Sequence, residues 1–298
     1  MAEPVRANDA PLVSVAMATL NAERTLPAAV ASLLMQTHAR WELIMIDDGS
    51  SDGSVQAVRR FADPRIRVLA DGAHRGLAAR LNQAVGLAQG DLLARMDQDD
   101  VCYPERFARQ VAFLQANPAV NLVGSTALVF EGEGRPVGLL RARENHADIC
   151  ARPWAGFYLP HPTWMGRTAW FRANPYNERN VRSEDQELLL RTHETSRFAA
   201  LPEPLLGYRQ DRVELRKVLH SRYSFSRALL RRSAARRAPA LALRGVGGQL
   251  AKAAFDTLAI STGTERRLLA HRARPLPAGA AERWRDVWRL AAAAAAKH

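Results

Sequence analysis

Cysteine is scarce in this chain of 298 residues, which contains only Cys102 and Cys150. The two cysteines lie far apart in the sequence, and no CxxC pair occurs. Their scarcity and spacing argue against a disulfide scaffold and against a cysteine-based zinc site. We therefore expect a protein of a reducing compartment.

Long apolar runs are also missing. The longest candidate, residues 239–260, is interrupted by four polar or charged side chains, and the alanine run at 291–296 is too short to cross a bilayer. Residues 1–9 are polar and lack the apolar core of a secretory signal. These absences predict a cytoplasmic protein that is soluble or bound to a membrane only at its surface.

Acidic residues are in deficit at one end of the chain only. The formal charge is +12, but residues 1–213 hold 24 basic against 25 acidic side chains. Residues 214–298 hold 18 basic against 5 acidic side chains and therefore carry the whole excess. A basic chain is typical of proteins that bind nucleic acid or anionic membranes. Here that argument applies to the C-terminal segment alone, and we expect no nucleic-acid partner for the protein.

Short apolar runs alternate with helical patterns from residue 12 to residue 130. The expected strands are residues 12–19, 41–46, 66–69, 91–96 and 120–130, and the expected helices are residues 25–37, 54–61, 77–88 and 104–117. This alternation with short loops predicts an α/β fold with a mostly parallel central sheet and helices on both faces. Ligands bind such sheets at the carboxyl ends of the strands.

The strand expected at residues 91–96 ends in three carboxylates, Asp97, Asp99 and Asp100. Like charges so close together repel one another, and burying them is costly without a cation. Mg²⁺ and Mn²⁺ take one or two protein carboxylates and complete their coordination with phosphate and water. The pattern predicts a metal–diphosphate site, and the alternative is a solvated acidic turn or a cap for the helix after Pro104.

A second acidic segment, Asp47–Asp52, follows the strand at residues 41–46. Gly49 permits a sharp turn there, and Asp48 at the strand tip suits hydrogen bonds from a nucleobase or a ribose. The alternative is that Ser51 or Asp52 caps the next helix. Since both acidic segments follow strands of one parallel sheet, we expect them at the same rim.

Taken in order, these segments resemble an inverting family 2 glycosyltransferase with the GT-A fold. The resemblance is carried by Val13–Thr19, Asn21, Glu23, Ser32, Gln36, Glu42–Asp52, Gly76, Arg80, Asn82, Arg95–Asp100, Pro104, Arg106 and Gln110. It continues through His161–Thr163 and Ser183–Asp185 and covers about the first 210 residues.

The resemblance implies a Rossmann-like GT-A domain that binds a nucleotide-diphospho-sugar, with a UDP-sugar favoured, together with Mn²⁺ or Mg²⁺. Asp48 would contact the base, and Thr19 and Glu23 would help to line the nucleotide pocket. Asp97 would approach the ribose, and Asp99 would ligate the metal. Residues 97–99 would then form the DxD element of such enzymes.

The resemblance also implies a catalytic base. In an inverting transfer a carboxylate takes the proton of the attacking hydroxyl. Asp185 matches the base of the family, with Glu184 beside it at the substrate. The alternative is that both acids only complement the N-terminus of a helix expected from Ser183 to Arg191.

Two further residues have open roles. His161 would touch the diphosphate or the acceptor, and the alternative is a structural histidine in a tight turn. Arg80 would neutralise phosphate, as would Arg95 and Arg209, and the alternative is ion pairing with nearby acids.

We expect a GT-A catalytic domain over residues 1–213, with a nucleotide-sugar half at about 10–130 and an acceptor half at about 131–213. Residues 214–298 form a basic helical C-terminal extension, with helices expected at 214–237, 240–260 and 280–296. Basic amphipathic helices bind anionic membranes. The extension would therefore dock on the inner face of the plasma membrane, and the alternative is that it only caps the catalytic domain.

The implied activity is transfer of a sugar to a saccharide or lipid-linked acceptor, in the synthesis of cell-surface polysaccharide, lipopolysaccharide or glycolipid. Two other classes compete with it. A metal-dependent nucleotidyltransferase would favour a glycine-rich basic phosphate loop, which Thr19–Thr25 lacks. A nucleic-acid-binding protein would fit the overall charge but not the near-neutral first 213 residues.

Overall fold

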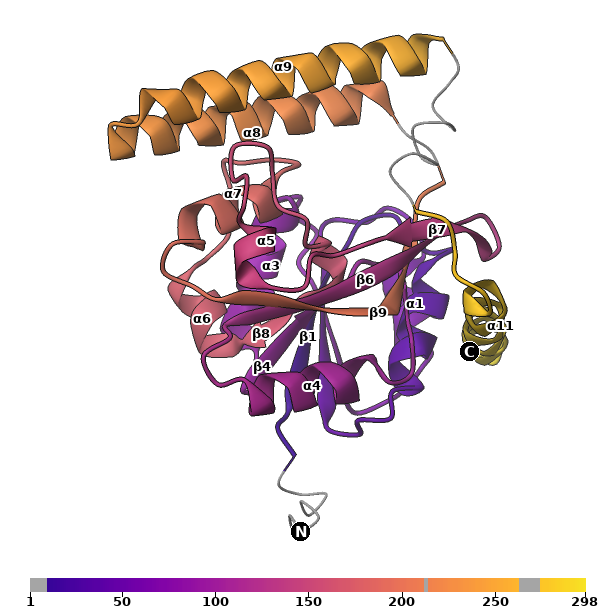
Figure 1. Cartoon of the computed structure of the whole chain (residues 1–298). Coiled ribbons are helices and arrows are strands. Elements are labelled where there is room, and N and C mark those ends of the chain that lie inside the picture. The colour runs from indigo at the N-terminus through magenta and orange to yellow at the C-terminus, as the bar shows by residue number, and fades with distance from the viewer. Residues whose placement is uncertain (1–9, 212–213, 263–273) are drawn as a thin grey trace.

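The computed structural model describes residues 10–211, 214–262 and 274–298 (Figure 1), so residues 1–9, with the expected absence of a secretory signal, lie outside the described part. One nine-stranded sheet forms the centre, in the order β3-β2-β1-β4-β8-β6-β9-β5, with β7 paired to β6. The strands are β1 Val13–Thr19, β2 Trp41–Asp47, β3 Ile66–Ala70, β4 Leu92–Arg95, β5 Val101–Cys102, β6 Leu122–Glu131, β7 Arg135–Leu140, β8 Met165–Arg167 and β9 Phe198–Arg209.

The sheet is parallel where the acidic segments lie. Strands β3, β2, β1 and β4 are parallel neighbours, and β6 is parallel to β9. The three-residue β8 lies between β4 and β6 and is antiparallel to both. Strands β1 and β2 are buried almost throughout, as expected of parallel strands covered on both faces. The predicted α/β fold with a mostly parallel sheet is confirmed.

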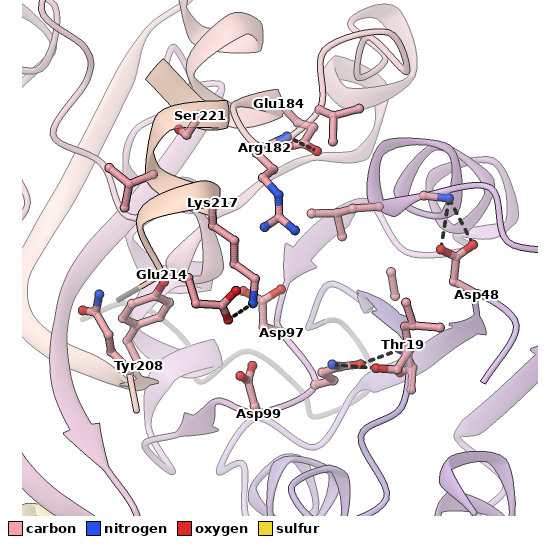
Figure 2. Close-up of a pocket in the computed structure, with 18 of the residues that line it drawn as sticks. Thr19, Asp48, Asp97, Asp99, Arg182, Glu184, Tyr208, Glu214, Lys217 and Ser221 are labelled. Atoms are coloured by element: carbon pink, nitrogen blue, oxygen red, sulfur yellow. Dashed lines mark hydrogen bonds and ion pairs between the residues drawn. The ribbon is translucent and has the colours of Figure 1, made fainter. Parts of the chain in front are cut away.

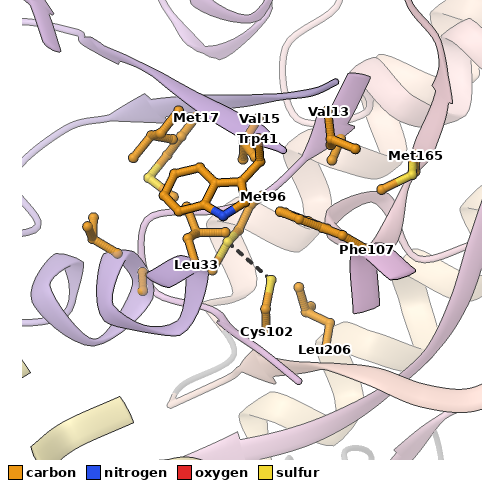
Figure 3. Packing of buried hydrophobic residues seen from close by; sticks show 14 of the residues in the cluster. Val13, Val15, Met17, Leu33, Trp41, Met96, Cys102, Phe107, Met165 and Leu206 are labelled. Atoms are coloured by element: carbon orange, nitrogen blue, oxygen red, sulfur yellow. Dashed lines mark hydrogen bonds between the residues drawn. The ribbon is translucent and has the colours of Figure 1, made fainter. Parts of the chain in front are cut away.

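Helices cover both faces of the sheet. The helices of the described residues are α1 Leu26–Leu34, α2 Ser54–Arg59, α3 Leu77–Leu87, α4 Arg106–Ala116, α5 His146–Ile149, α6 Thr168–Ala173, α7 Glu184–Thr192, α8 Leu215–Arg236, α9 Pro239–Ser261 and α11 Ala280–Ala295, with a 3-10 turn at His161–Thr163. On one face Met17 packs with Leu33 of α1 and Phe107 of α4 (Figure 3). On the other face Ile44 packs with Leu81 of α3.

The residues at two helix N-cap positions make their side-chain hydrogen bonds elsewhere. Thr25 and Ser183 stand at the N-cap positions of α1 and α7, but neither side chain makes a capping hydrogen bond. The Thr25 hydroxyl instead donates to the carbonyl of Gln98, 3.3 Å away, and the Ser183 hydroxyl accepts from Asn180 Nδ2 at 2.8 Å. Both hydroxyls therefore tie a helix start to a neighbouring loop.

The three C-terminal helices follow the expected ranges, and they divide into two groups. Helices α8 and α9 form an antiparallel hairpin that lies across the top of the molecule (Figure 1). Helix α11 returns to the sheet and packs on α1. No helix in the described part of the chain is long and apolar enough to cross a membrane.

Helix α11 is fixed to the edge of the sheet by Trp284. The indole is fully buried, its Nε1 donates to the Gly134 carbonyl at 2.8 Å, and its ring lies 4.8 Å from that of Phe130. Gly207 of β9 has no side chain at the point where a Cβ atom would come within 2.0 Å of the indole. The last helix therefore shares a hydrophobic core with β6, although its sequence lies in the expected extension.

Candidate active site

The tips of β2, β1 and β4 carry the acidic segments and open into one cavity. Since these three strands are parallel neighbours, their carboxyl ends meet at the same edge of the sheet. A cavity of about 830 Å³ lies there (Figure 2), lined by Thr19, Asp48, Asp97, Asp99 and Glu184 among others. The prediction that both acidic segments reach one rim is confirmed.

Asp48 is the hub of one wall of this cavity. Its carboxylate accepts hydrogen bonds from the backbone of Arg75 at 2.7 Å and Gly76 at 3.0 Å, and it pairs with Arg80 Nε at 2.9 Å. Arg80 is 1% exposed and also reaches Asp71 at 2.6 Å. Arg80 therefore lies behind Asp48, in the ion-pairing arrangement, and fixes the turn that borders the cavity.

The loop after β2 is closed by its own acids. Asp47 Oδ2 accepts from the backbone of Gly49 and Ser50, and Asp52 Oδ1 accepts from Ser54 N at 3.0 Å, at the start of α2. Glu23 does not line the cavity. Its carboxylate accepts from Gly53 N at 3.1 Å and so holds this loop against the one after β1.

The loop of residues 97–99, the predicted DxD element, is held from both sides. Arg95, which is buried, donates to Asp97 Oδ2 at 2.6 Å. The side-chain amide of Gln98 accepts from the backbone N–H of Leu20 at 2.7 Å and donates to its carbonyl at 3.2 Å. These bonds fix the loop that carries Asp99 to the tip of β1.

Asp99 is the carboxylate that this network leaves unpaired. It makes no ion pair within the described residues, and it faces the cavity (Figure 2). Burial first, and the charge of Asp97 second, raise the pKa of Asp99 to about 6. Asp100 is fully buried, accepts from Arg209 N at 3.0 Å through Oδ1, and has no described partner for Oδ2. The loop thus carries more negative charge than the protein around it neutralises.

These residues fit a divalent cation that a diphosphate helps to bind. The described residues contain no group of three or more His, Cys, Asp or Glu side chains that would hold a metal alone. Mg²⁺ and Mn²⁺ need only one or two carboxylates when phosphate and water complete the shell. The unpaired, desolvated carboxylate of Asp99 meets that requirement, and a cation there would relieve its repulsion with Asp97.

A second cavity, of about 350 Å³, adjoins the first and contains Asp185. Asp97 and Tyr208 line both cavities, and His161 lines the second one. Asp185 Oδ2 accepts from Gln186 Nε2 at 3.0 Å, and burial raises the pKa of the Asp185 carboxyl. Its neighbour Glu184 lines the first cavity instead, because successive helical residues point about 100° apart.

His161 is a neutral, anchored ring in this structure. Its Nε2 lies 2.8 Å from the hydroxyl of Tyr176, and its ring meets the edge of Trp164 at 4.6 Å between centroids. Burial first, and the nearby Arg95 charge second, hold the pKa of His161 well below its usual range. The ring borders the cavity of Asp185 while its position is set from behind.

Two cations face the first cavity that the sequence reasoning did not single out. The Arg182 guanidinium points into it (Figure 2) and has no hydrogen bond or ion pair within the described residues. Lys217, on the first turn of α8, also lines it and pairs with Glu214. Arg182 has a left-handed backbone, with φ of 67°, whereas Lys217 is one of many basic residues on α8. The sequence pattern therefore shows neither the backbone conformation of Arg182 nor which basic residue of α8 reaches the cavity.

The comparisons with known proteins agree with this geometry. The family description "Glycosyl transferase family 2" matches residues 14–192. EpsE of Bacillus subtilis, whose name describes a glycosyltransferase, is 35% identical over 237 residues, which are 77% of this chain and 84% of EpsE. WfgD of Escherichia coli, named as a UDP-Glc:alpha-D-GlcNAc-diphosphoundecaprenol beta-1,3-glucosyltransferase, is 35% identical over 118 residues. That match spans 40% of this chain and about half of WfgD, at 47%.

Solved structures show the same fold at low sequence identity. S. aureus TarS in complex with UDP-GlcNAc has a TM-score of 0.59 at 18% identity, covering 74% of this chain and 66% of that one. The mannosyltransferase PcManGT of Pyrobaculum calidifontis, in complex with GDP-Man and Mn²⁺, has a TM-score of 0.58 at 18% identity, covering 96% and 86%. With the family match over more than half of its length, the chain belongs to glycosyl transferase family 2.

Proposed function

We propose that this glycosyltransferase moves a sugar from a nucleotide-diphospho-sugar, a UDP-sugar first among them, to a hydroxyl acceptor with inversion at the anomeric carbon. One observation carries the proposal. The cavity that contains Asp48, Asp97 and Asp99 adjoins the cavity that contains Asp185, and Asp97 and Tyr208 line both. A donor in the first cavity would therefore present its sugar to an acceptor in the second.

The donor would lie across the tips of β2, β1 and β4. Asp48 and Thr19 would border the base and ribose, and the Oγ1 atom of Thr19 is buried with no partner among the described residues. Glu23 and Arg80 would act from behind this wall by holding its two loops. Arg182 and Lys217 would neutralise the diphosphate, since both line this cavity, Arg182 from the loop before α7 and Lys217 from α8.

The acceptor hydroxyl would lie at Asp185. The oxygen of the acceptor hydroxyl forms a bond to the anomeric carbon while the bond from that carbon to the diphosphate oxygen breaks. The electrons of the broken bond leave with the nucleoside diphosphate. Asp185 takes the hydroxyl proton as general base. The raised pKa of Asp185 makes its carboxylate a stronger base than an exposed aspartate. Glu184 and His161 would shape the walls on either side.

Mn²⁺ or Mg²⁺ is the proposed cofactor, with Asp99 as the protein ligand and Asp97 beside it. When bound, the cation would stabilise the negative charge that develops on the leaving diphosphate. The Mn²⁺ in the PcManGT complex supports this assignment. In this structure the hydrogen bond from Arg95 holds Asp97 in place.

The relatives suggest a role in cell-surface polysaccharide synthesis. The name of WfgD describes transfer to a sugar on diphosphoundecaprenol, and that of a further match, from Escherichia coli K12, describes colanic acid biosynthesis. We propose a saccharide or lipid-linked acceptor of this kind.

The test is UDP release from a panel of UDP-sugars with Mn²⁺ and candidate acceptors, and NMR of the product shows the anomer. Wild type is compared with Asp99→Ala, Asp185→Asn and Glu187→Gln, the last being a carboxylate of α7 that lines neither cavity. We expect Glu187→Gln to turn over like wild type and the other two to lose at least about 100-fold. Equal turnover in all four proteins, or a product with retained configuration, would contradict the proposal.

We propose in addition that the α8–α9 hairpin contacts an anionic membrane surface. Helix α9 leaves four large apolar side chains exposed: Leu243 at 79%, Leu250 at 65%, Phe255 at 58% and Leu258 at 65%. Arginines of α8 support the alternative of packing, since Arg232 and Arg236 pair with Glu194 on the catalytic domain.

Flotation with phosphatidylglycerol-containing vesicles separates these two roles. Wild type should float, and a Leu250→Glu, Leu258→Glu variant should not, because the charges would face the acyl region. Leu290→Glu on α11, also at an exposed leucine, serves as the matched control. If the α9 variant floats like wild type, the hairpin is not the contact.

A further inference from the structure

A third cavity, of about 1030 Å³, lies between α9 and the segment that follows β7. Its walls come from residues 140–143, Tyr158, Arg222, four residues of α9 and Arg274. None of the sequence motifs points to it. Five of its lining side chains are cationic and one, Asp256, is acidic. The cavity is open to solvent, and its residues Arg141, Arg143 and Arg274 are exposed, so an anionic ligand could reach them.

The charges are not balanced within the described residues. Arg222 pairs with Asp256 at 3.0 Å, and Lys252 donates to the Ala155 carbonyl at 2.7 Å. The guanidinium groups of Arg141 and Arg274 make no hydrogen bond or ion pair with the described residues. Arg141 and Arg274 therefore face the cavity without an acidic partner among the described residues.

The fold fixes where two of these arginines stand. Arg274 exchanges both backbone hydrogen bonds with Leu139 of β7, at 2.8 and 2.9 Å, so it lies beside the end of that strand. Arg143 donates its backbone N–H to the Tyr158 carbonyl at 3.1 Å, and its guanidinium lies 5.0 Å from the Tyr158 ring. Backbone hydrogen bonds to a strand and to a loop therefore fix the positions of Arg274 and Arg143.

The cationic cavity continues the one that contains Asp185. Leu140, Arg141 and Tyr158 line both of them. An acceptor whose hydroxyl lies at Asp185 would therefore extend past Arg141 into the cationic cavity. The outer wall of that cavity includes Phe255 of α9, which is 58% exposed and lies three residues before the exposed Leu258. The path runs from a carboxylate, past arginines, to an apolar surface.

We propose that the cationic cavity binds a phosphate or diphosphate group carried by the acceptor, with Arg141 and Arg274 as its main ligands and Arg143 beside them. Guanidinium groups suit this role because they bind phosphate oxygens in pairs and stay charged. An apolar chain on the same phosphate would leave along Phe255 and Leu258. The inference rests on the proposed function, and it narrows the acceptor to a phosphate-linked, amphipathic one.

The test uses farnesyl diphosphate as the probe, with binding measured by calorimetry on the full chain. Wild type should bind it, and an Arg141→Ala, Arg274→Ala variant should bind about tenfold more weakly or worse for each arginine lost. Arg289→Ala, on α11 and away from the cavity, should bind like wild type. Arg182→Ala, in the donor cavity, should also keep this binding, which excludes the donor site as its location.

Two further probes separate the sources of affinity. Farnesol should bind far more weakly than farnesyl diphosphate, and inorganic pyrophosphate should compete only weakly. Equal binding of farnesyl diphosphate to the double variant and to wild type, or equal binding of farnesol, would overturn the inference. UDP binding with Mn²⁺ should be unchanged in the double variant. If wild type itself does not bind UDP with Mn²⁺, that result would instead contradict the proposed function.

Discussion

Glu184 and Asp185 are adjacent in the first turn of α7, yet they line different cavities. Glu184 faces the cavity of the DxD element and accepts from Arg182 N at 2.9 Å, whereas Asp185 faces the cavity of His161. Burial raises the pKa of both carboxyl groups. The start of one helix therefore supplies a wall to each of the two adjoining cavities.

The raised pKa of Asp185 predicts the acid limb of the pH profile. A general base acts only when deprotonated, so kcat/KM should fall as the pH drops through a value above the ordinary 3.8 of aspartate. Glu187→Gln should keep this limb, and Asp185→Asn should lose at least about 100-fold in activity and should no longer show the limb. A limb that persists unchanged in the residual activity of Asp185→Asn would assign it to another group.

The same pKa shift has a consequence for stability with a defined sign. The folded protein holds the Asp185 proton more tightly than the unfolded chain, so ionisation lowers the free energy of unfolding as the pH rises through that window. Asp185→Asn removes this penalty and should unfold at higher denaturant concentration than wild type at neutral pH. Below pH 3.8, where wild type is protonated in both states, the difference should shrink. Urea unfolding at the two pH values measures it.

The sequence predicts the acidic rim because the rim follows from strand order alone. Asp48 and Asp97 come at the ends of apolar runs in a strand–helix alternation, and such ends meet at one edge of a parallel sheet. Residues 131–213 follow no such pattern. Strand β8 has three residues, too few to show a period, and β9 carries Pro202 and Pro204.

The cavity-lining cations and the packing of the C-terminal helix follow less directly from the sequence than the acidic strand ends do. Arg182 has a left-handed backbone conformation, which sequence periodicity does not predict. The helical pattern also does not tell which of Trp284 and Leu290 is buried, although the structure buries Trp284 and exposes Leu290. The charge count separates residues 214–298 from residues 1–213, yet Lys217 lines the cavity of Asp97 and Asp99, and Trp284 lies in a core with β6. These are contacts between segments far apart in the chain, which local patterns do not encode.

Removal of the metal should show that Asp99, and not a neighbouring carboxylate, is the ligand of the cation. UDP with Mn²⁺ should raise the melting temperature of wild type, because a ligand that binds only the folded state stabilises it. EDTA should reverse the part due to Mn²⁺, and Asp99→Asn should show only the remainder. Asp211→Asn, at an exposed carboxylate that binds Gly132 N, is the control. A full Mn²⁺ response in Asp99→Asn would exclude Asp99 as the ligand.

Arg182 should contribute charge at the expense of backbone strain. Arg182→Gly removes the guanidinium and suits the left-handed conformation, so it should stabilise the fold by about 1 kcal/mol. The same variant should lose about tenfold in kcat/KM for the donor, because the diphosphate loses a cation. Arg182→Lys should recover part of the activity without the gain in stability. Parallel thermal unfolding and kinetics test both halves, and a variant that is more stable and equally active would remove Arg182 from the donor site.

Trp284 should be the residue on which the position of α11 depends. Trp284→Ala leaves a hole against Phe130 and Gly207, and large-to-small changes at fully buried aromatics cost about 3–5 kcal/mol. Leu290→Ala, at an exposed leucine of the same helix, should change stability by less than about 0.5 kcal/mol. Gly207→Ala should also destabilise, since its methyl group would overlap the indole.

Loss of the Trp284 side chain should also change the candidate active site, because the indole packs against β9. Gly207 is followed directly by Tyr208, which lines both the cavity of Asp99 and the cavity of Asp185. If α11 steadies this strand, Trp284→Ala should raise KM for the donor under conditions where circular dichroism shows the protein still folded. If the helix is only an appendage, a folded Trp284→Ala protein will have wild-type kinetics and unfolding. Urea unfolding and donor kinetics on the same preparation distinguish the two cases.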